Sequence, residues 1–162
     1  MSSVRLIPND LQEVARAFLR DRASDGYSHS IRGASWDGDV YSIAANLDAG
    51  ELVDDPRDRP LLVAIQHGHV EAVKMLIANG ASTGGVNNEE VFYDEPSPLI
   101  LAIRSGRSDI VAILLEGGAS VDEREIWGNL EYPLHAAVRS EDYEIFHMVL
   151  NKGPKVDCVD LM

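Results

Sequence analysis

Apolar residues recur along this chain at intervals of three and four positions, in short segments that end at glycine. In one segment Val73, Leu76 and Ile77 stand at i, i+3 and i+4, which predicts a single apolar stripe on an amphipathic helix. Gly80 follows, and glycine accepts the left-handed conformation that ends many helices. Upstream, Pro60 predicts the start of another helix, because proline presets φ for the first turn and loses no hydrogen bond there. The pattern therefore predicts two short helices, one after the other.

This two-helix pattern occurs four times in the sequence. The positions that recur at matching offsets are Pro60, Ala64, Gly68, Val73, Leu76 and Gly80, then Pro98, Ala102, Gly106, Val111, Leu114 and Gly118, then Pro133, Ala137, Phe146, Val149 and Gly153. In the copy that begins at Pro133, Glu141 stands where the mid-repeat glycine is expected. A fourth, degraded copy precedes these three, and in it Ser30 replaces the proline. Helices of about eight to ten residues are not stable alone in water. Each copy must therefore pack against its neighbours.

These recurring residues resemble the ankyrin repeat, whose signature is a threonine-proline-leucine-histidine start, an alanine, a glycine-histidine pair and a leucine-leucine-x-x-glycine-alanine end. The resemblance covers residues 30–157. It implies an all-α ankyrin-repeat solenoid of about four repeats plus an N-terminal capping helix. Arg59, Ser97 and Tyr132 depart from the signature threonine, and only His135 keeps the histidine that braces the neighbouring loop in the family.

The repeat spacing divides the chain into five segments. The first predicted segment, 1–29, holds a capping helix over about 10–21 and a connector. Residues 30–59 form a degenerate repeat, and residues 60–97 form a repeat with a long finger loop. Residues 98–132 form the next repeat, and residues 133–162 form the last repeat and an apolar tail. Two alternatives stay open for the tail. It folds back over the last helices, which we favour, or the array continues or pairs with another copy there.

The charge of the chain narrows the class of partner. Acidic residues outnumber basic ones by 27 to 14, a net charge of −13, which argues against nucleic acid or an anionic membrane as the main partner.

The single cysteine, Cys158, cannot form an internal disulfide, and no stretch has the roughly 18 apolar residues of a spanning helix. We therefore expect an intracellular location, in the cytoplasm or nucleus.

No motif for a reaction, a cofactor or a metal is found in the sequence. Gly84 and Gly85 match neither a phosphate-binding loop nor a dinucleotide fingerprint. His67 and His69, two residues apart at a predicted helix end, are expected to diverge rather than share a metal ion. His69 also occupies the structural glycine-histidine position of the family. We predict that the chain has no cofactor and is not an enzyme.

Acidic residues concentrate in the three loops between repeats. Residues 51–59, 81–97 and 119–132 hold twelve acidic residues against three basic ones. One interpretation is that solvated loops keep a repeat protein soluble. The other is that they form a negative rim that steers a basic partner and raises its association rate. The sequence leaves both open.

Aromatic and charged residues near these loops are candidates for partner contact. By the resemblance, Trp36, His67, Arg104 and Arg139 occupy groove positions on the first helices, and the two arginines are suited to pair with a partner carboxylate. The full predicted set is Trp36, His67, Glu89, Glu90, Phe92, Tyr93, Asp94, Arg104, Trp127, Tyr132 and Arg139. For Phe92 and Trp127, packing within the loop is an equally good interpretation.

The predicted function is a non-catalytic protein–protein interaction module that presents a groove and acidic finger loops to a protein or peptide partner. The predicted partner carries basic residues, and the chain itself is a monomer or a weak dimer through its C-terminal end. The alternative is a small-molecule binder or an unconventional enzyme with a pocket between the long finger and the groove. That pocket is expected to be lined by Tyr93, Asp94, Trp127, Tyr132 and His135.

Overall fold

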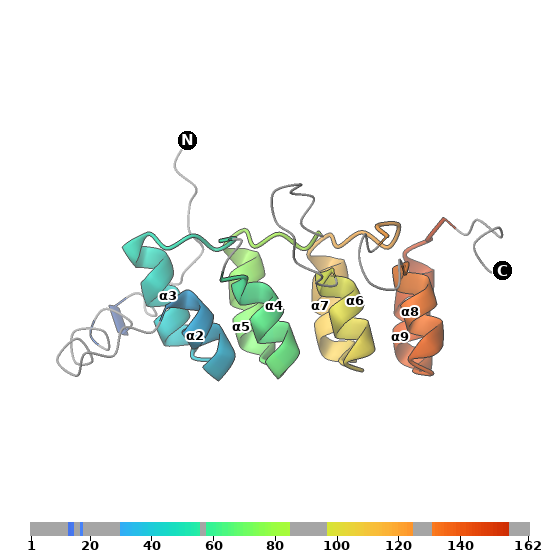
Figure 1. Ribbon diagram of the computed structural model, residues 1–162, viewed down its shortest axis with the longest axis horizontal. Helices are drawn as coiled ribbons and strands as arrows, with labels where there is room; N and C mark the ends of the chain where they lie inside the picture. The colour runs from blue at the N-terminus through green and yellow to red at the C-terminus, as the bar shows by residue number, and fades with distance from the viewer. Residues whose placement is uncertain are drawn as a thin grey trace. The chain divides into compact units, whose positions relative to one another are not determined.

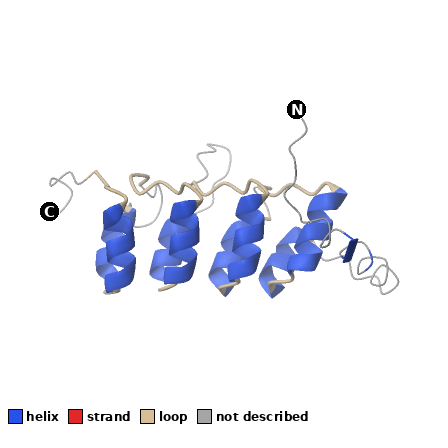
Figure 2. Ribbon diagram, turned by 180° about the vertical axis from the view of Figure 1, so that it is seen from behind, coloured by secondary structure: helices blue, strands red, loops and turns tan. Residues whose placement is uncertain are grey.

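The computed structural model describes Glu13, Val14, Ala17 and residues 30–55, 58–84, 97–124 and 131–155. The chain divides into two compact units, Met1–Ser82 and Thr83–Met162, and each is described by itself. Across the described residues, the regular structure is helical (Figure 2). The all-α class expected from the sequence is confirmed for them.

The first unit contains two consecutive helix pairs. Its helices are α2 (Ile31–Asp37), α3 (Val40–Ala49), α4 (Pro60–His67) and α5 (Val70–Ala78). Helix α2 packs beside α4, and α3 packs beside α5 (Figure 1). Ile43, Ala64, Val73 and Leu76 have no exposed surface, so the apolar stripe read from the sequence is the core of this unit.

The second unit repeats the same arrangement. Its helices are α6 (Pro98–Arg104), α7 (Ser108–Glu116), α8 (Pro133–Arg139) and α9 (Tyr143–Asn151). Helix α6 packs beside α8, and α7 beside α9 (Figure 1). Ile100, Ile103, Ile110 and Leu114 are fully buried in its core. The prediction that short helix pairs support one another by packing is confirmed within each unit.

The helices begin and end at the residues that the pattern indicated. The three prolines occupy the first turns of α4, α6 and α8. In the degraded copy, Ser30 replaces the proline and caps α2 instead, since its hydroxyl oxygen accepts a hydrogen bond from Gly33 N at 3.3 Å. Gly38 and Gly68, with φ of 70° and 73°, end α2 and α4.

Glu141 shows that the turn after the first helix survives the loss of its glycine. Its φ of 57° is close to the 64° of Gly106 at the matching position of the preceding repeat. A left-handed conformation is uncommon for a residue with a Cβ atom. The packing of the α8–α9 pair therefore holds Glu141 in a conformation that its side chain disfavours.

The ends of the chain are described only in part. Glu13, Val14 and Ala17 are helical, in line with the predicted capping helix, and the rest of that helix lies outside the described residues. Cys158 and the apolar tail also lie outside them. The division of the chain into five segments stays a prediction.

Candidate functional site

An exposed aromatic group lies at the ends of the first helices in the first unit. Trp36, in the last turn of α2, is 54% exposed. Its ring centroid lies 3.8 Å from that of His67, the last residue of α4. His69 Nε2 lies 2.8 Å from the Trp36 carbonyl oxygen, within hydrogen-bond distance. We call Trp36, His67 and His69 the aromatic cluster.

The two histidines of the aromatic cluster do not diverge, so that expectation is wrong. Their ring centroids are 6.2 Å apart and their planes differ by only 14°. The reason is Gly68, whose positive φ ends α4 between them. His69 therefore lies outside α4, and its ring points toward the turn at Gly38 that ends α2. A Cβ atom added to Gly38 would lie 2.5 Å from His69 Nδ1, so this glycine makes room for the ring.

In the second unit two arginines, Arg104 and Arg139, approach the same carboxylate, that of Glu131. We call these two residues the arginine pair. Arg104, at the end of α6, approaches Glu131 Oε2 with Nη2 at 2.8 Å and Nε at 3.2 Å. Arg139, at the end of α8, places Nη2 3.2 Å from Glu131 Oε1. We expected these arginines to face a partner carboxylate. In the structure both contact a carboxylate of their own chain, Glu131, and their pairing with a partner carboxylate stays a prediction.

Glu131 is the buried member of this group. It is 3% exposed, whereas the side chains of Arg104 and Arg139 are 34% and 66% exposed. Its Oε1 is buried and receives no hydrogen bond from the described residues, because Arg139 approaches it as an ion pair without hydrogen-bond alignment. Burying a carboxylate is costly unless it is paired. Arg104, with two contacts to Oε2, supplies most of that pairing.

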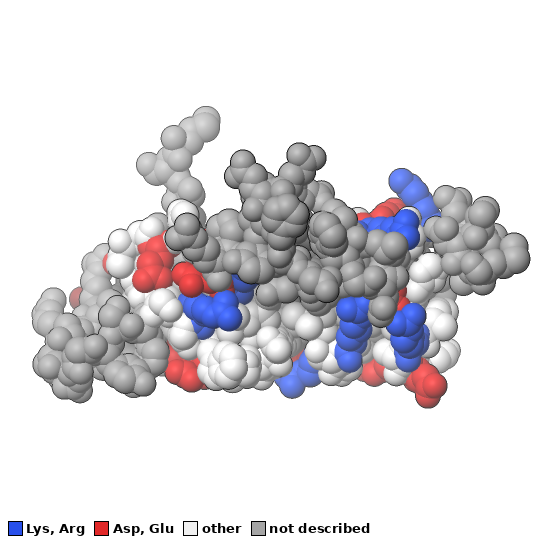
Figure 3. All heavy atoms as spheres, viewed as in Figure 1, with Lys and Arg blue, Asp and Glu red and all other residues white. Residues whose placement is uncertain are grey.

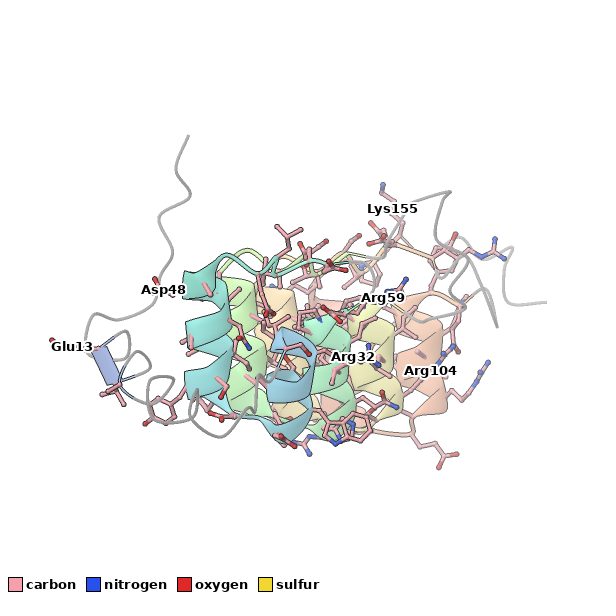
Figure 4. The ribbon with its side chains drawn as sticks, turned by 60° about the vertical axis from the view of Figure 1, so that its left-hand side comes forward. Glu13, Arg32, Asp48, Arg59, Arg104 and Lys155 are labelled. Atoms are coloured by element: carbon pink, nitrogen blue, oxygen red, sulfur yellow. The ribbon has the colours of Figure 1, made fainter. Side chains whose placement is uncertain are left out.

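The basic side chains of these helices reach the surface. Figure 3 shows blue side chains over α6 and α8, the helices that carry the arginine pair. Figure 4 labels Arg104 together with Arg32, which extends from α2 and donates from Nη1 to the Asp58 carbonyl oxygen at 3.0 Å. Arg104 and Arg32 thus also act within their own units, where each joins a helix to a loop.

Several acidic side chains of the loops accept hydrogen bonds from backbone N–H groups far along the chain, which was not expected from the sequence. Glu51 accepts a hydrogen bond from Ile31 N at 2.8 Å, Asp54 accepts one from Ser82 N at 2.9 Å, and Asp122 accepts one from Lys155 N at 2.7 Å. Glu131 is buried, so both the solvated-loop and the negative-rim interpretations are wrong for it. The remaining acidic residues of the loops keep both interpretations open.

Other predicted residues lie near the base of the last loop or outside the described part. Tyr132 makes an edge-to-face contact with His135, with ring centroids 5.7 Å apart, and Arg124 Cζ lies 5.9 Å from the Tyr132 ring centroid. The predicted residues outside the described part are Glu89, Glu90, Phe92, Tyr93, Asp94 and Trp127. Of the five residues expected to line a ligand pocket, only Tyr132 and His135 are therefore placed.

Neither a metal-binding group nor a membrane-spanning helix occurs in the described part of the chain. Groups of three histidine, cysteine or acidic side chains suited to a metal ion do not occur among these residues. Their helices are also too short, or too polar, to cross a bilayer.

Comparison with known families identifies the repeat. The family model described as ankyrin repeats in three copies matches residues 34–125 and 61–160. A comparison with curated proteins finds no match. The matched ranges include all the helices from α2 to α9 except the first residues of α2, and the paired helices, the prolines at helix starts and the left-handed glycines at helix ends agree with this family. The chain belongs to the ankyrin-repeat family.

Proposed function

We propose that this chain binds a protein or peptide partner and that the aromatic cluster is the centre of that contact in the first unit. Ankyrin repeats generally mediate protein–protein interaction. The observation that carries the proposal is the exposure of Trp36, 54% on a helix whose other large apolar residue, Ile31, is 1% exposed. Tryptophan is enriched among the residues that dominate binding energy at interfaces.

The contacts around Trp36 support a pre-organised anchor. Its ring is in contact with His67, and its carbonyl oxygen is within hydrogen-bond distance of His69. A side chain already held by neighbours loses less conformational freedom when a partner binds. The exposed indole surface is therefore available for contact at a low entropic cost.

The charge of the surroundings favours a basic group on the partner. Asp37, exposed and next to Trp36 in the sequence, adds an acidic residue to this end of α2. A lysine or arginine over an indole ring gains cation–π attraction, and the net charge of −13 steers basic segments toward the chain. We place this binding in the cytoplasm or nucleus, because the single cysteine requires no oxidising compartment.

Arg139 adds a preference in the second unit. Its side chain is 66% exposed and meets Glu131 only by an unaligned ion pair. Guanidinium groups bind carboxylates through parallel hydrogen bonds, and the exposure of the Arg139 side chain leaves it accessible to a carboxylate of a partner. For the second unit taken by itself, the proposed contact is an acidic residue of a partner against Arg139.

Removal of the indole tests the proposal. We expect Trp36→Ala to weaken partner capture from the native host lysate at least tenfold, a loss of about 1.4 kcal/mol that is modest for a central tryptophan. The measurement is quantitative mass spectrometry of captured proteins at low salt, with circular dichroism to show that the helices remain.

Leu52→Ala is the matched control, because Leu52 is 66% exposed and makes no contact in the aromatic cluster. Capture by this variant is expected to equal that of the unmodified chain. Equal capture by the Trp36→Ala variant would remove the aromatic cluster from the interface.

A further inference from the structure

The last helix pair exposes apolar residues whose counterparts one repeat earlier are buried. Val138 in α8 is 61% exposed, whereas Ile103 at the matching position of α6 is fully buried. Leu150 in α9 is 40% exposed, whereas Leu115 in α7 is only 5% exposed. The difference therefore affects both helices of the pair.

Two further positions show the same change. Leu134 and Phe146 are half-buried, whereas their counterparts Leu99 and Val111 are 1% and 0% exposed. In the preceding pair, α6 lies against α8 and α7 lies against α9. We call Leu134, Val138, Phe146 and Leu150 the outer face of α8 and α9. These four residues are apolar, like the buried residues of the preceding pair, but no described residue covers them fully.

We infer that residues 156–162 of this same chain lie across the outer face. This segment follows Lys155 directly and reads Val-Asp-Cys-Val-Asp-Leu-Met, so five of its seven residues are apolar. Lys155 N is held 2.7 Å from Asp122 Oδ1, which fixes the point where the segment begins, just after α9. The inference does not depend on the partner-binding proposal.

The length of the segment suits the face. Seven extended residues span up to about 23 Å. Helix α9 has nine residues, which corresponds to about 13 Å along its axis. The segment therefore reaches along the whole of α9 with residues to spare for α8. Burial of large aliphatic side chains such as Leu150 and Leu161 favours this contact.

A second copy of the chain is the competing occupant. Each copy carries a net charge of −13, so two copies repel one another at low salt. A segment tethered at Lys155 also avoids the translational and rotational entropy that association costs. Both arguments favour the segment of the same chain over a dimer.

The single cysteine of the chain allows a direct test. Cys158 lies in the segment, so the variants Val138→Cys and Leu150→Cys each place one new thiol on the outer face. Under diamide oxidation, we expect an intramolecular disulfide to Cys158 in at least one variant, formed at least tenfold faster than in the control. Mass spectrometry of non-reduced peptides identifies the bond, in which two thiols are oxidised and diamide is reduced.

Asp109→Cys is the control, because Asp109 lies in the first turn of α7, its side chain is 50% exposed, and it is not part of the outer face. Covalent dimers in the Val138→Cys and Leu150→Cys variants would show that a second copy covers the face and would overturn the inference. Failure of both variants to bridge faster than the control would overturn it as well.

Discussion

Replacing Gly38 with alanine is expected to destabilise the first unit by about 3 kcal/mol. The left-handed φ of 70° costs a residue with a Cβ atom about 1 kcal/mol. The new methyl group also meets the His69 ring at 2.5 Å and displaces it from the Trp36 carbonyl, which costs a hydrogen bond worth about 1 kcal/mol and a repacking term of similar size. Urea unfolding followed by circular dichroism measures the change in the free energy of unfolding.

Gly106→Ala separates the two causes. Gly106 has a similar φ of 64°, and a Cβ atom there meets nothing within 4 Å. We expect it to cost only the conformational part, about 1 kcal/mol. If the Gly38 and Gly106 variants lose equal stability, His69 does not brace the α2 turn. In a His69→Ala background, the excess cost of Gly38→Ala is expected to disappear.

Replacing Arg104 with methionine is expected to destabilise the second unit by about 3 kcal/mol. The variant leaves Glu131, 3% exposed, with Arg139 as its remaining arginine contact. Removing one partner of a buried ion pair costs about 3–5 kcal/mol, and the half-exposed position of Arg104 places the expected loss at the lower end. Methionine keeps a comparable apolar stem, so the change reports mainly on the charge.

Arg139→Met is the matched variant, because it removes the other arginine of the same carboxylate. Its side chain is 66% exposed, and its ion pair lacks hydrogen-bond alignment. Exposed ion pairs contribute about 0–1 kcal/mol, so we expect a loss below about 1 kcal/mol in urea unfolding. Equal losses in the two variants would contradict the unequal roles assigned to the two arginines.

The helix pairs could be predicted because their determinants are local. Pro60 and Gly68 bound α4, and Val73 and Leu76, whose spacing predicted a helix before Gly80, lie on the buried side of α5. Helix starts, helix ends and apolar stripes depend on neighbours within a few positions of the chain. The same local information repeated at fixed offsets indicated the family.

The roles of Glu131 and of the loop aspartates could not be read in this way. Glu131 meets Arg104 across 27 positions, and Asp122 meets Lys155 across 33. One signal was present, since Asp54 and Asp122 both stand four residues after a helix-ending glycine. Each accepts a backbone N–H from the following repeat, so a recurring loop carboxylate indicates a brace as well as surface charge.

The aromatic cluster was identified only in part. Trp36 and His67 were candidates from their groove positions, but His69 was assigned only the structural role of its family motif. The contact of His69 with Trp36 depends on the left-handed turn at Gly68, which redirects the chain after α4. A helical extrapolation through Gly68 placed the two histidines incorrectly for that reason.

Hydrogen–deuterium exchange with and without the captured partner tests the binding role of the aromatic cluster most directly. We predict that partner binding slows amide exchange in peptides covering Ile31–Asp37 and Pro60–His67, the helices that carry Trp36 and His67. Unchanged exchange in both helices, with protection confined to other segments of the bound chain, would contradict the assignment.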